Sequence, residues 1–165
     1  MDDGAQDRGR GDGATESPPA LDERDRILLD RLQRDGRASY AELGRACGLS
    51  APAAAERVRR LEAAGVIAGY GARVDRARLG RPLTAFVRLR VSGEAYKRLR
   101  AALDDMPAVL ACHGVTGEDG LILEVATASI AELDGLLSDL ATYGQTASSI
   151  VLSTWLDARP VTPGP

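Results

Sequence analysis

The sequence predicts an α+β fold in which a three-helix unit is followed by a βαββαβ unit. Two observations support this order. Three apolar stripes of helical period, each with its own capping residues, fall within residues 22–65. Between residues 84 and 156, segments that alternate in polarity are interrupted by two further helical stripes. The chain of 165 residues is long enough for two such small domains.

The first two helices are indicated by the residues at their ends. Asp22 is suited to cap a helix over residues 22–35, because its side chain can accept hydrogen bonds from first-turn amides. Ser39 and Glu42 form an S-x-x-E capping box that opens a second, short helix. Gly48 is placed to end that helix in a left-handed conformation.

The third helix completes a helix-turn-helix pattern. Ser50 caps it, Gly65 ends it, and a turn of only a few residues separates it from the short second helix. Arginines on and near it can bind phosphate, and small residues at its start allow close approach to a major groove. The alternative is a solvated charged face beside Glu56 and Glu62. The candidate DNA-binding residues are Arg37, Arg45, Ser50, Ala51, Ala53, Ala54, Arg57, Arg59 and Arg60.

Positive charge is concentrated in this part of the chain. The net charge of the whole chain is −3, but residues 21–82 carry 13 arginines against nine acidic residues. Nucleic-acid binding needs such a local excess of basic side chains, because contacts to the phosphate backbone dominate affinity. The charge distribution therefore favours double-stranded DNA as a partner.

The remaining sequence divides the chain into segments. Residues 66–75 are predicted to form a turn and one strand, followed by a basic segment with glycine and proline. We expect a disordered tail at residues 1–20, a helix-turn-helix domain at 21–75, a linker at 76–83, a second domain at 84–158 and a short tail at 159–165.

The second domain is predicted to have the ferredoxin-like order of elements. Strands are expected at 84–91, 109–115, 121–127 and 146–156, with helices at 94–105 and from Ser129 to near Gly144. Ser129 and Glu132 form another capping box, and the inward side of the last helix is expected to carry Ile130, Leu133, Leu137 and Leu140. Two helices cover one face of such a sheet, so we expect a second chain to cover the other.

Composition argues against several other classes. No run of about 18 uncharged apolar residues suits a membrane span, and no secretion signal precedes the helices. Cys47 and Cys112 are far apart, which favours two buried thiols over a disulfide framework or a metal site. We expect a soluble cytoplasmic protein without metal or cofactor.

The order of these parts resembles the Lrp/AsnC (feast/famine) family of transcriptional regulators. The resemblance covers about residues 21–158 and rests on three stretches: LDERDRILLDRLQRDGRASYAELGRACGLS, ERVRRLEAAGVIAGYGARVD and ACHGVTGEDGLILEV. It implies a winged helix-turn-helix followed by a ferredoxin-like, ACT-like (RAM) domain that dimerises and senses an amino acid. It also implies a homodimer, with tetramers or octamers as further assemblies, whose DNA affinity or oligomeric state changes with the effector.

The resemblance places the effector near a glycine-containing turn in the second domain. The residues it implies as effector contacts are His113, Gly117, Glu118, Asp119 and Gly120. Glycine amides can hold a carboxylate, and an acidic side chain can hold an ammonium group. The same residues would also make a plain hairpin turn, and a single histidine on a strand is often structural. Many relatives carry the acidic residue at the position of Gly120, so the contacts here differ in detail.

Two alternatives to an effector-responsive regulator remain. One is a DNA-binding or architectural regulator that has no small-molecule effector. The other is an enzyme resembling the sirohaem decarboxylases, which share the architecture but depend on histidine-rich sites. This chain has a single histidine and no recognisable catalytic set, so we expect no enzymatic activity.

Overall fold

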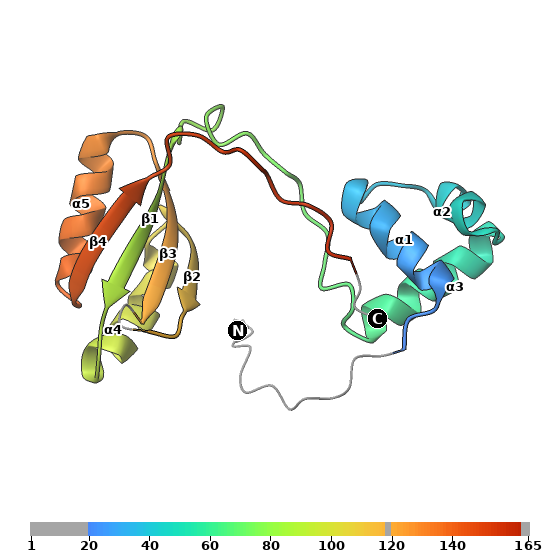
Figure 1. The fold of residues 1–165 in the computed structure, drawn as a ribbon, viewed down its shortest axis with the longest axis horizontal. Helices are drawn as coiled ribbons and strands as arrows, with labels where there is room; N and C mark the ends of the chain where they lie inside the picture. The colour runs from blue at the N-terminus through green and yellow to red at the C-terminus, as the bar shows by residue number, and fades with distance from the viewer. Residues whose placement is uncertain (1–19, 118–119, 163–165) are drawn as a thin grey trace, which may run out of the picture. The chain divides into compact units, whose positions relative to one another are not determined.

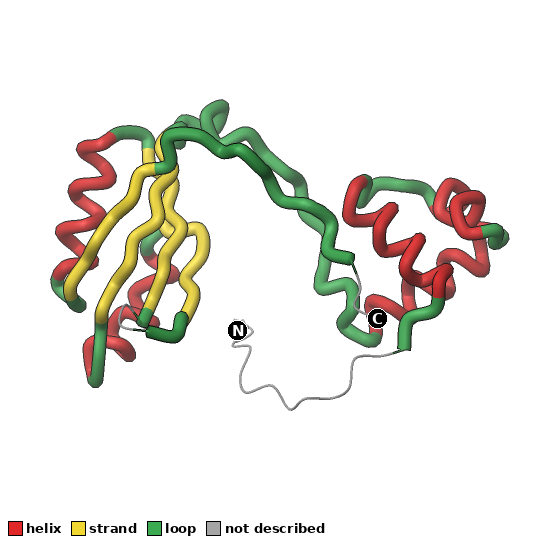
Figure 2. Tube along the Cα trace, in the orientation of Figure 1, coloured by secondary structure: helices red, strands yellow, loops and turns green. Residues whose placement is uncertain are grey.

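The computed structural model describes residues 20–117 and 120–162 (Figures 1 and 2). Residues 1–19 of the predicted tail at 1–20 lie outside this range. Contacts along the chain divide it into two compact units. The first extends to Gly71 and includes the segment from Ala158 onward, and the second comprises Ala72–Asp157. Each unit is described separately.

The first unit contains the three predicted helices: α1 (Glu23–Arg34), α2 (Tyr40–Cys47) and α3 (Ala51–Ala63). The sequence-based capping predictions are confirmed, since Asp22, Ser39 and Ser50 are the N-caps. Leucines and other small apolar side chains from the three inward stripes meet in one core. The buried members are Leu28, Leu43, Cys47, Ala54 and Val58. Helical spacing places the apolar residues of each helix on one face, and the three faces pack against one another.

The turn between α2 and α3 depends on two glycines. Gly48 ends α2 with φ 66°, a left-handed conformation that only glycine adopts without strain. Gly44 lies inside α2, where an added Cβ would come within 2.6 Å of the Leu49 carbonyl oxygen. The Leu49 amide also donates to the Gly44 carbonyl at 2.8 Å. This close approach of two backbones sets the tight angle between the helices.

The strand predicted at residues 66–75 is not formed. A strand needs a hydrogen-bonded neighbour, and no described strand pairs with this segment. Residues 66–70 instead line a pocket together with Leu29, Leu32 and Gln33 of α1. Tyr70 lies against Gly36 and donates its hydroxyl to Glu62 of α3 at 2.9 Å. Burial and the Glu62 carboxylate raise the pKa of Tyr70 to about 12, so its hydroxyl stays protonated as a donor.

The C-terminal segment also joins the first unit. The Gln33 side chain of α1 makes two hydrogen bonds with the main chain of Val161. Its amide nitrogen donates to the Val161 carbonyl at 3.0 Å, and its oxygen accepts from the Val161 amide at 2.7 Å. The side-chain amide thus pairs with the main chain as a neighbouring strand would.

The second unit is a four-stranded antiparallel sheet in the order β2-β3-β1-β4. Its strands are β1 (Leu83–Arg90), β2 (Val109–Gly114), β3 (Leu121–Thr127) and β4 (Gln145–Ile150). Helices α4 (Glu94–Ala102), continued by a 3₁₀ turn at Leu103–Asp105, and α5 (Ile130–Ala141) cover one face (Figure 1). The predicted βαββαβ order is confirmed. Between sheet and helices lies an aliphatic core that includes Val87, Leu89, Leu99, Leu123, Val125, Leu133 and Leu140.

Three details of the second unit differ from the sequence-based prediction. The last strand ends at Ile150 rather than 156. The register pairs Ile150 with Ala85, the Val151 amide still donates to the Thr84 carbonyl at 2.9 Å, and residues 153–156 lie beyond the start of β1 at Leu83. Ile130 is 57% exposed, since it lies in the first turn of α5, beyond the edge of the core. The Glu132 carboxylate accepts from the Ala128 amide at 2.7 Å instead of closing a box with Ser129.

Within the described residues, no helix is both long and apolar enough to span a membrane. No group of three or more potential metal ligands occurs among these same residues.

Candidate nucleic-acid interface and effector turn

The start of α3 carries the small residues that were expected to face DNA. The Ser50 hydroxyl accepts from the Ala53 amide at 3.4 Å, so it serves the helix cap. Ala51 and Ala53 are half-buried, whereas Ala54 is fully buried in the core of the first unit. Ala54 therefore positions the helix, and the exposed surface at its start belongs to Ser50, Pro52 and parts of the two alanines.

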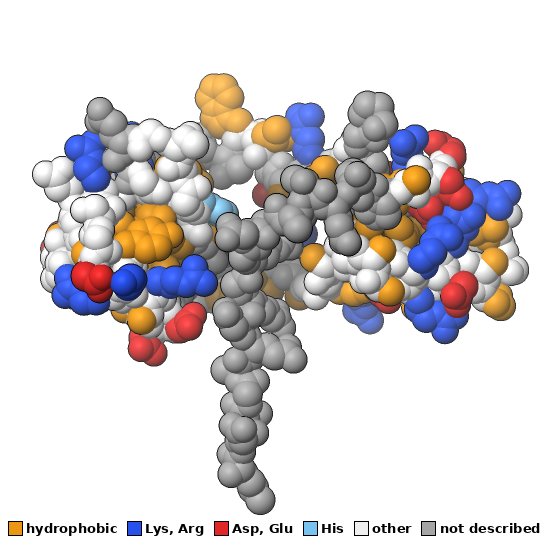
Figure 3. Space-filling view, turned by 90° about the horizontal axis from the view of Figure 1, so that it is seen from below, with side chains coloured by type: hydrophobic (Ala, Val, Ile, Leu, Met, Phe, Trp, Pro, Cys, Tyr) orange, Lys and Arg blue, Asp and Glu red, His pale blue; other side chains and the backbone are white. Residues whose placement is uncertain are grey.

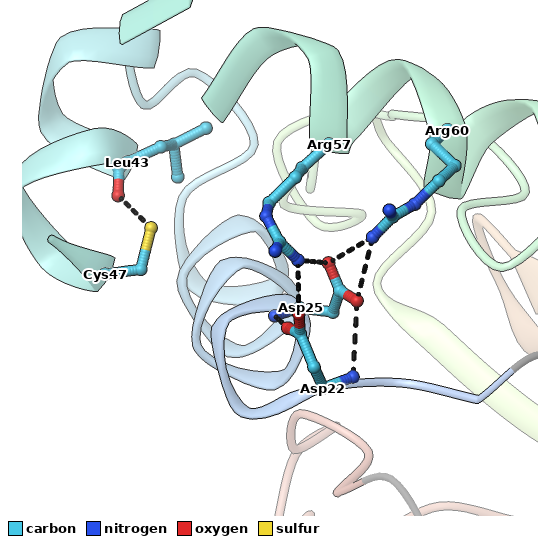
Figure 4. A network of polar contacts seen from close by, with 6 residues as sticks. All are labelled: Asp22, Asp25, Leu43, Cys47, Arg57 and Arg60. Atoms are coloured by element: carbon cyan, nitrogen blue, oxygen red, sulfur yellow. Dashed lines mark hydrogen bonds and ion pairs between the residues drawn. The ribbon is translucent and has the colours of Figure 1, made fainter. Parts of the chain in front are cut away.

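Two of the candidate arginines on α3 hold a buried acid (Figure 4). Arg57 donates to Asp25 at 2.8 Å and to Asp22 at 2.7 Å. Arg60 donates to both Asp25 oxygens at 3.1 Å. The Asp25 side chain is only 2% exposed, and a carboxylate buried to that degree requires compensating charge. These contacts fasten the N-terminus of α1 to the middle of α3.

The network also changes proton affinities. Hydrogen bonds from the Asp25 amide and from Arg57 lower the pKa of Asp22. The two aspartates in turn raise the pKa of Arg57. Both residues are therefore held in their charged forms near neutral pH, which keeps the network intact under physiological conditions.

The remaining candidate arginines are exposed. Arg37 lies in the loop before α2, and Arg45 lies on the outer side of α2 beside Arg31 and Glu42. Arg59 extends into solvent from α3. It forms an ion pair with Glu56 at 2.9 Å, and both side chains of this pair are mostly exposed. Figure 3 shows basic side chains gathered on the surface of this unit. Exposed arginines of this kind can exchange their partners for phosphate at small cost.

Sequence reasoning missed Asp25 as a partner of the α3 arginines, although a signal was present. Asp25 stands three residues before Leu28, on the inward stripe of α1. An acid on an apolar stripe must find a cation when the helix packs. The two basic residues that meet it lie about 30 positions later, and only packing of α1 against α3 brings them together.

The candidate effector turn joins β2 to β3. Gly117 and Gly120 have φ of 104° and 73°, values that favour glycine, and the Val115 amide donates to the Gly120 carbonyl at 2.9 Å. His113 is exposed near the end of β2, opposite Ile122 in the register. The structure thus brings His113, Gly117 and Gly120 into one hairpin. Glu118 and Asp119, the acidic members of the predicted set, lie outside the described residues.

The sheet face opposite the helices carries both apolar and charged side chains. The register places Phe86 beside Glu124 and Ser149, and Arg88 beside Ile122 and Ala147. Phe86 is 44% exposed although it lies at the centre of the sheet. Trp155, just beyond β4, is 95% exposed and lines a broad groove with Phe86. Large apolar side chains left open in this way are typical of a surface that another protein covers.

Family models match both units of the chain. The AsnC-type helix-turn-helix domain matches residues 21–62, and the Lrp/AsnC ligand binding domain matches residues 84–161. The chain belongs to the Lrp/AsnC family of transcriptional regulators. It is therefore a DNA-binding regulator, and the family resemblance seen in the sequence is confirmed.

Individual Lrp/AsnC relatives resemble the chain over most of its length. It is 39% identical to the transcriptional regulator LrpA of Mycobacterium tuberculosis, over 85% of this chain and 95% of that protein. The solved structure of Bacillus subtilis LrpC matches with a TM-score of 0.80 at 30% identity, covering 85% of this chain and 99% of that one. A feast or famine regulatory protein from M. tuberculosis, solved in complex with L-methionine, matches with a TM-score of 0.80 at 39% identity, covering 87% of this chain and 100% of that one.

Proposed function

We propose that this regulator binds specific sites in double-stranded DNA through α3 and that an amino acid modulates this binding. The observation that carries the proposal is the pairing, in one chain, of an arginine-bearing helix-turn-helix with a ligand-binding-type domain. We expect it to act in the cytoplasm, where its DNA is found, and without enzymatic activity.

The proposed DNA contacts divide into two kinds. Arg37, Arg45 and Arg59 are exposed and suited to phosphate, which fixes position without reading sequence. Ser50, Ala51 and Ala53 lie at the start of α3, the end that a recognition helix presents to base edges. Arg57 and Arg60 hold α3 in place through Asp25, and any contact they make with phosphate would use guanidinium groups already oriented by that carboxylate.

The proposed effector site is the β2–β3 turn. The main-chain amides of Gly117 and Gly120, two glycines with positive φ, would bind the carboxylate, and Glu118 or Asp119 would bind the ammonium group. His113 stands on the same hairpin and could line the site. The M. tuberculosis relative solved with L-methionine supports an amino acid as the class of ligand.

We further propose that the functional unit is at least a homodimer. Phe86 and Ile122 occupy the uncovered sheet face, and a second copy would bury them in the same way that the helices bury the other face. A dimer would place two α3 helices against two half-sites of a partly symmetric DNA sequence. Tetramers or octamers would extend this arrangement along the DNA.

The test is a titration of a labelled DNA fragment from upstream of the protein's own gene, with and without a pool of amino acids. Saturable binding whose affinity shifts with the pool supports the whole proposal. Saturable binding that ignores every amino acid supports the alternative, a regulator without an effector. Absence of saturable binding there and in a genomic selection contradicts the DNA-binding assignment of α3.

A further inference from the structure

The basic segment between the two predicted domains is folded onto the sheet of the second unit. Asp75 accepts from the Ala77 amide at 2.9 Å, and the Arg81 amide donates to the Arg76 carbonyl at 2.9 Å. These bonds close residues 75–81 into a compact turn. Arg76 and Arg81 stand at its two ends and are brought next to each other by the last of these bonds.

Both arginines reach groups on or next to β3. Arg76 pairs with the Glu124 carboxylate at 2.7 Å. Arg81 donates to the Ala126 carbonyl at 2.8 Å and to the Glu132 carboxylate of α5 at 3.2 Å. The side chains of the Arg76–Glu124 pair are 42% and 28% exposed, and those of the Arg81–Glu132 pair are 34% and 38% exposed, so both pairs are partly shielded from solvent. Arg78, in the same turn, has an 88% exposed side chain and pairs with Asp75 alone among the described contacts.

The strand that holds these arginines begins at the candidate effector turn. Leu121 starts β3 directly after Gly120, and Glu124 and Ala126 follow three and five residues later. β3 is hydrogen-bonded on both sides, to β1 and to β2, and its Leu121, Leu123 and Val125 side chains are buried. Close-packed interiors transmit strain, so a displacement of the turn on effector binding would reach the acceptors of Arg76 and Arg81 through this strand.

The other end of the linker leads to the DNA-reading helix. Three residues, 72–74, connect the turn to Gly71, and the preceding Tyr70 is hydrogen-bonded to Glu62 near the end of α3. We propose that Arg76 and Arg81 are the residues that transmit effector occupancy from β3 to the DNA-binding unit. They act as positioning residues rather than as DNA contacts. The proposal rests on the proposed effector turn.

The test compares three arginine-to-alanine variants of the full chain: Arg76→Ala, Arg81→Ala and, as the matched control, Arg78→Ala. All three remove one positive charge from the same turn. The quantity measured is the ratio of DNA dissociation constants with and without the amino acid that affects the wild type. A coupled regulator typically shows a ratio of about fivefold or more. We expect Arg76→Ala and Arg81→Ala to bring this ratio to within about twofold of one, with effector-free DNA affinity staying within about threefold of the Arg78→Ala variant.

A second arm identifies the partner. Glu124→Gln should reduce the ratio of dissociation constants as Arg76→Ala does. The double variant, with Glu124→Gln and Arg76→Ala together, should reduce the ratio no further than either single variant, because both changes break the same contact. The oligomeric state of each variant is checked by sedimentation, since Glu124 lies on the proposed dimer face. Arg78→Ala should keep the wild-type ratio.

Two results would overturn the proposal. One is equal weakening of DNA binding in all three arginine variants, with the slope of log affinity against log salt reduced by about one in each, as expected of direct phosphate contacts. The other concerns a wild type that binds DNA but responds to no amino acid. That result contradicts the proposed effector, and the role of the two arginines then depends on amide hydrogen exchange in residues 76–82. Faster exchange in Arg76→Ala and Arg81→Ala than in Arg78→Ala would show that the two arginines hold residues 76–82 on the sheet. Equal exchange in all three variants would reject that role.

Discussion

Arg57 of α3 and Asp25 of α1 are joined by a 2.8 Å hydrogen bond in which the acid is almost completely buried. Arg57 was expected from sequence to contact DNA, and the structure shows that it pairs with Asp25 and Asp22 at the N-terminus of α1. Buried charges of this kind contribute little net stability when paired but are costly to leave alone. The contact therefore predicts that replacing Arg57 lowers the stability of the protein more than replacing its exposed neighbour Arg59.

We expect Asp25→Ala to lower the free energy of unfolding by about 2 kcal/mol, because it leaves Arg57 and Arg60 without their shared carboxylate and removes part of a helix cap. Arg57→Ala should cost a similar amount, since it removes one of the two guanidinium groups that pair with the buried Asp25 carboxylate and also the contact to Asp22. Urea unfolding followed by circular dichroism measures both. Arg59→Ala is the control, with an expected change within about 0.5 kcal/mol. Loss of stability in Arg59→Ala as large as in Arg57→Ala would contradict this account.

Acid should destabilise the first unit through its helix caps. The pKa of Asp22 is lowered by the Asp25 amide and by Arg57, and that of Glu42 is lowered by its hydrogen bonds with Ser39. A carboxylate with a folded-state pKa below its unfolded one stabilises fully above the unfolded value and loses this effect as pH falls through the folded value. The melting temperature should therefore fall as pH drops from about 5 to about 3. Asp22→Asn keeps a good cap without the charge and should show a shallower fall; an unchanged slope would argue against Asp22.

Gly44 should be intolerant of any side chain. In Gly44→Ala the new Cβ would lie 2.6 Å from the Leu49 carbonyl oxygen, so the turn between α2 and α3 must open. We expect a loss of about 2–3 kcal/mol in unfolding free energy and weaker DNA binding. Gly48→Ala is the matched comparison, because open space surrounds Gly48 and only its positive φ opposes a side chain. Its expected cost is about 1 kcal/mol. A Gly44→Ala protein as stable as the wild type would show that the two helices can separate without penalty.

The uncovered sheet face should govern self-association. Phe86→Asp places a charge at the centre of the proposed dimer contact, and we expect the dissociation constant of the dimer to rise by tenfold or more, since each ~1.4 kcal/mol is a factor of ten. Sedimentation velocity over a range of concentrations measures this shift. Ser138→Asp adds the same charge at an exposed position of α5 and should leave association unchanged. Identical association of the two variants would mean that the dimer uses another surface.

Prediction from the sequence succeeded where information is local. The capping residues Asp22, Ser39 and Ser50 act within one helical turn, so each helix start could be placed correctly. Alternation over residues 84–91 predicted the strand that forms β1, and its alternating burial from Ala85 to Arg90 agrees with that pattern. The two strands that were placed wrongly, at 66–75 and beyond Ile150, depend on whether a neighbouring backbone is present, which no local pattern reports.

The candidate sites also have features that local sequence predicts and features that depend on packing. The sequence by itself determined which helix has the recognition pattern, which arginines are available and where the glycine turn lies, because these follow from residue type and spacing along one segment. Only the tertiary structure decided which arginines are engaged by protein carboxylates. Asp25 pairs with Arg57, and Arg76 pairs with Glu124, at sequence separations of 32 and 48 positions. Such pairings arise when separate elements pack together, and the packing, rather than the residues alone, determines whether a guanidinium group is left for another partner.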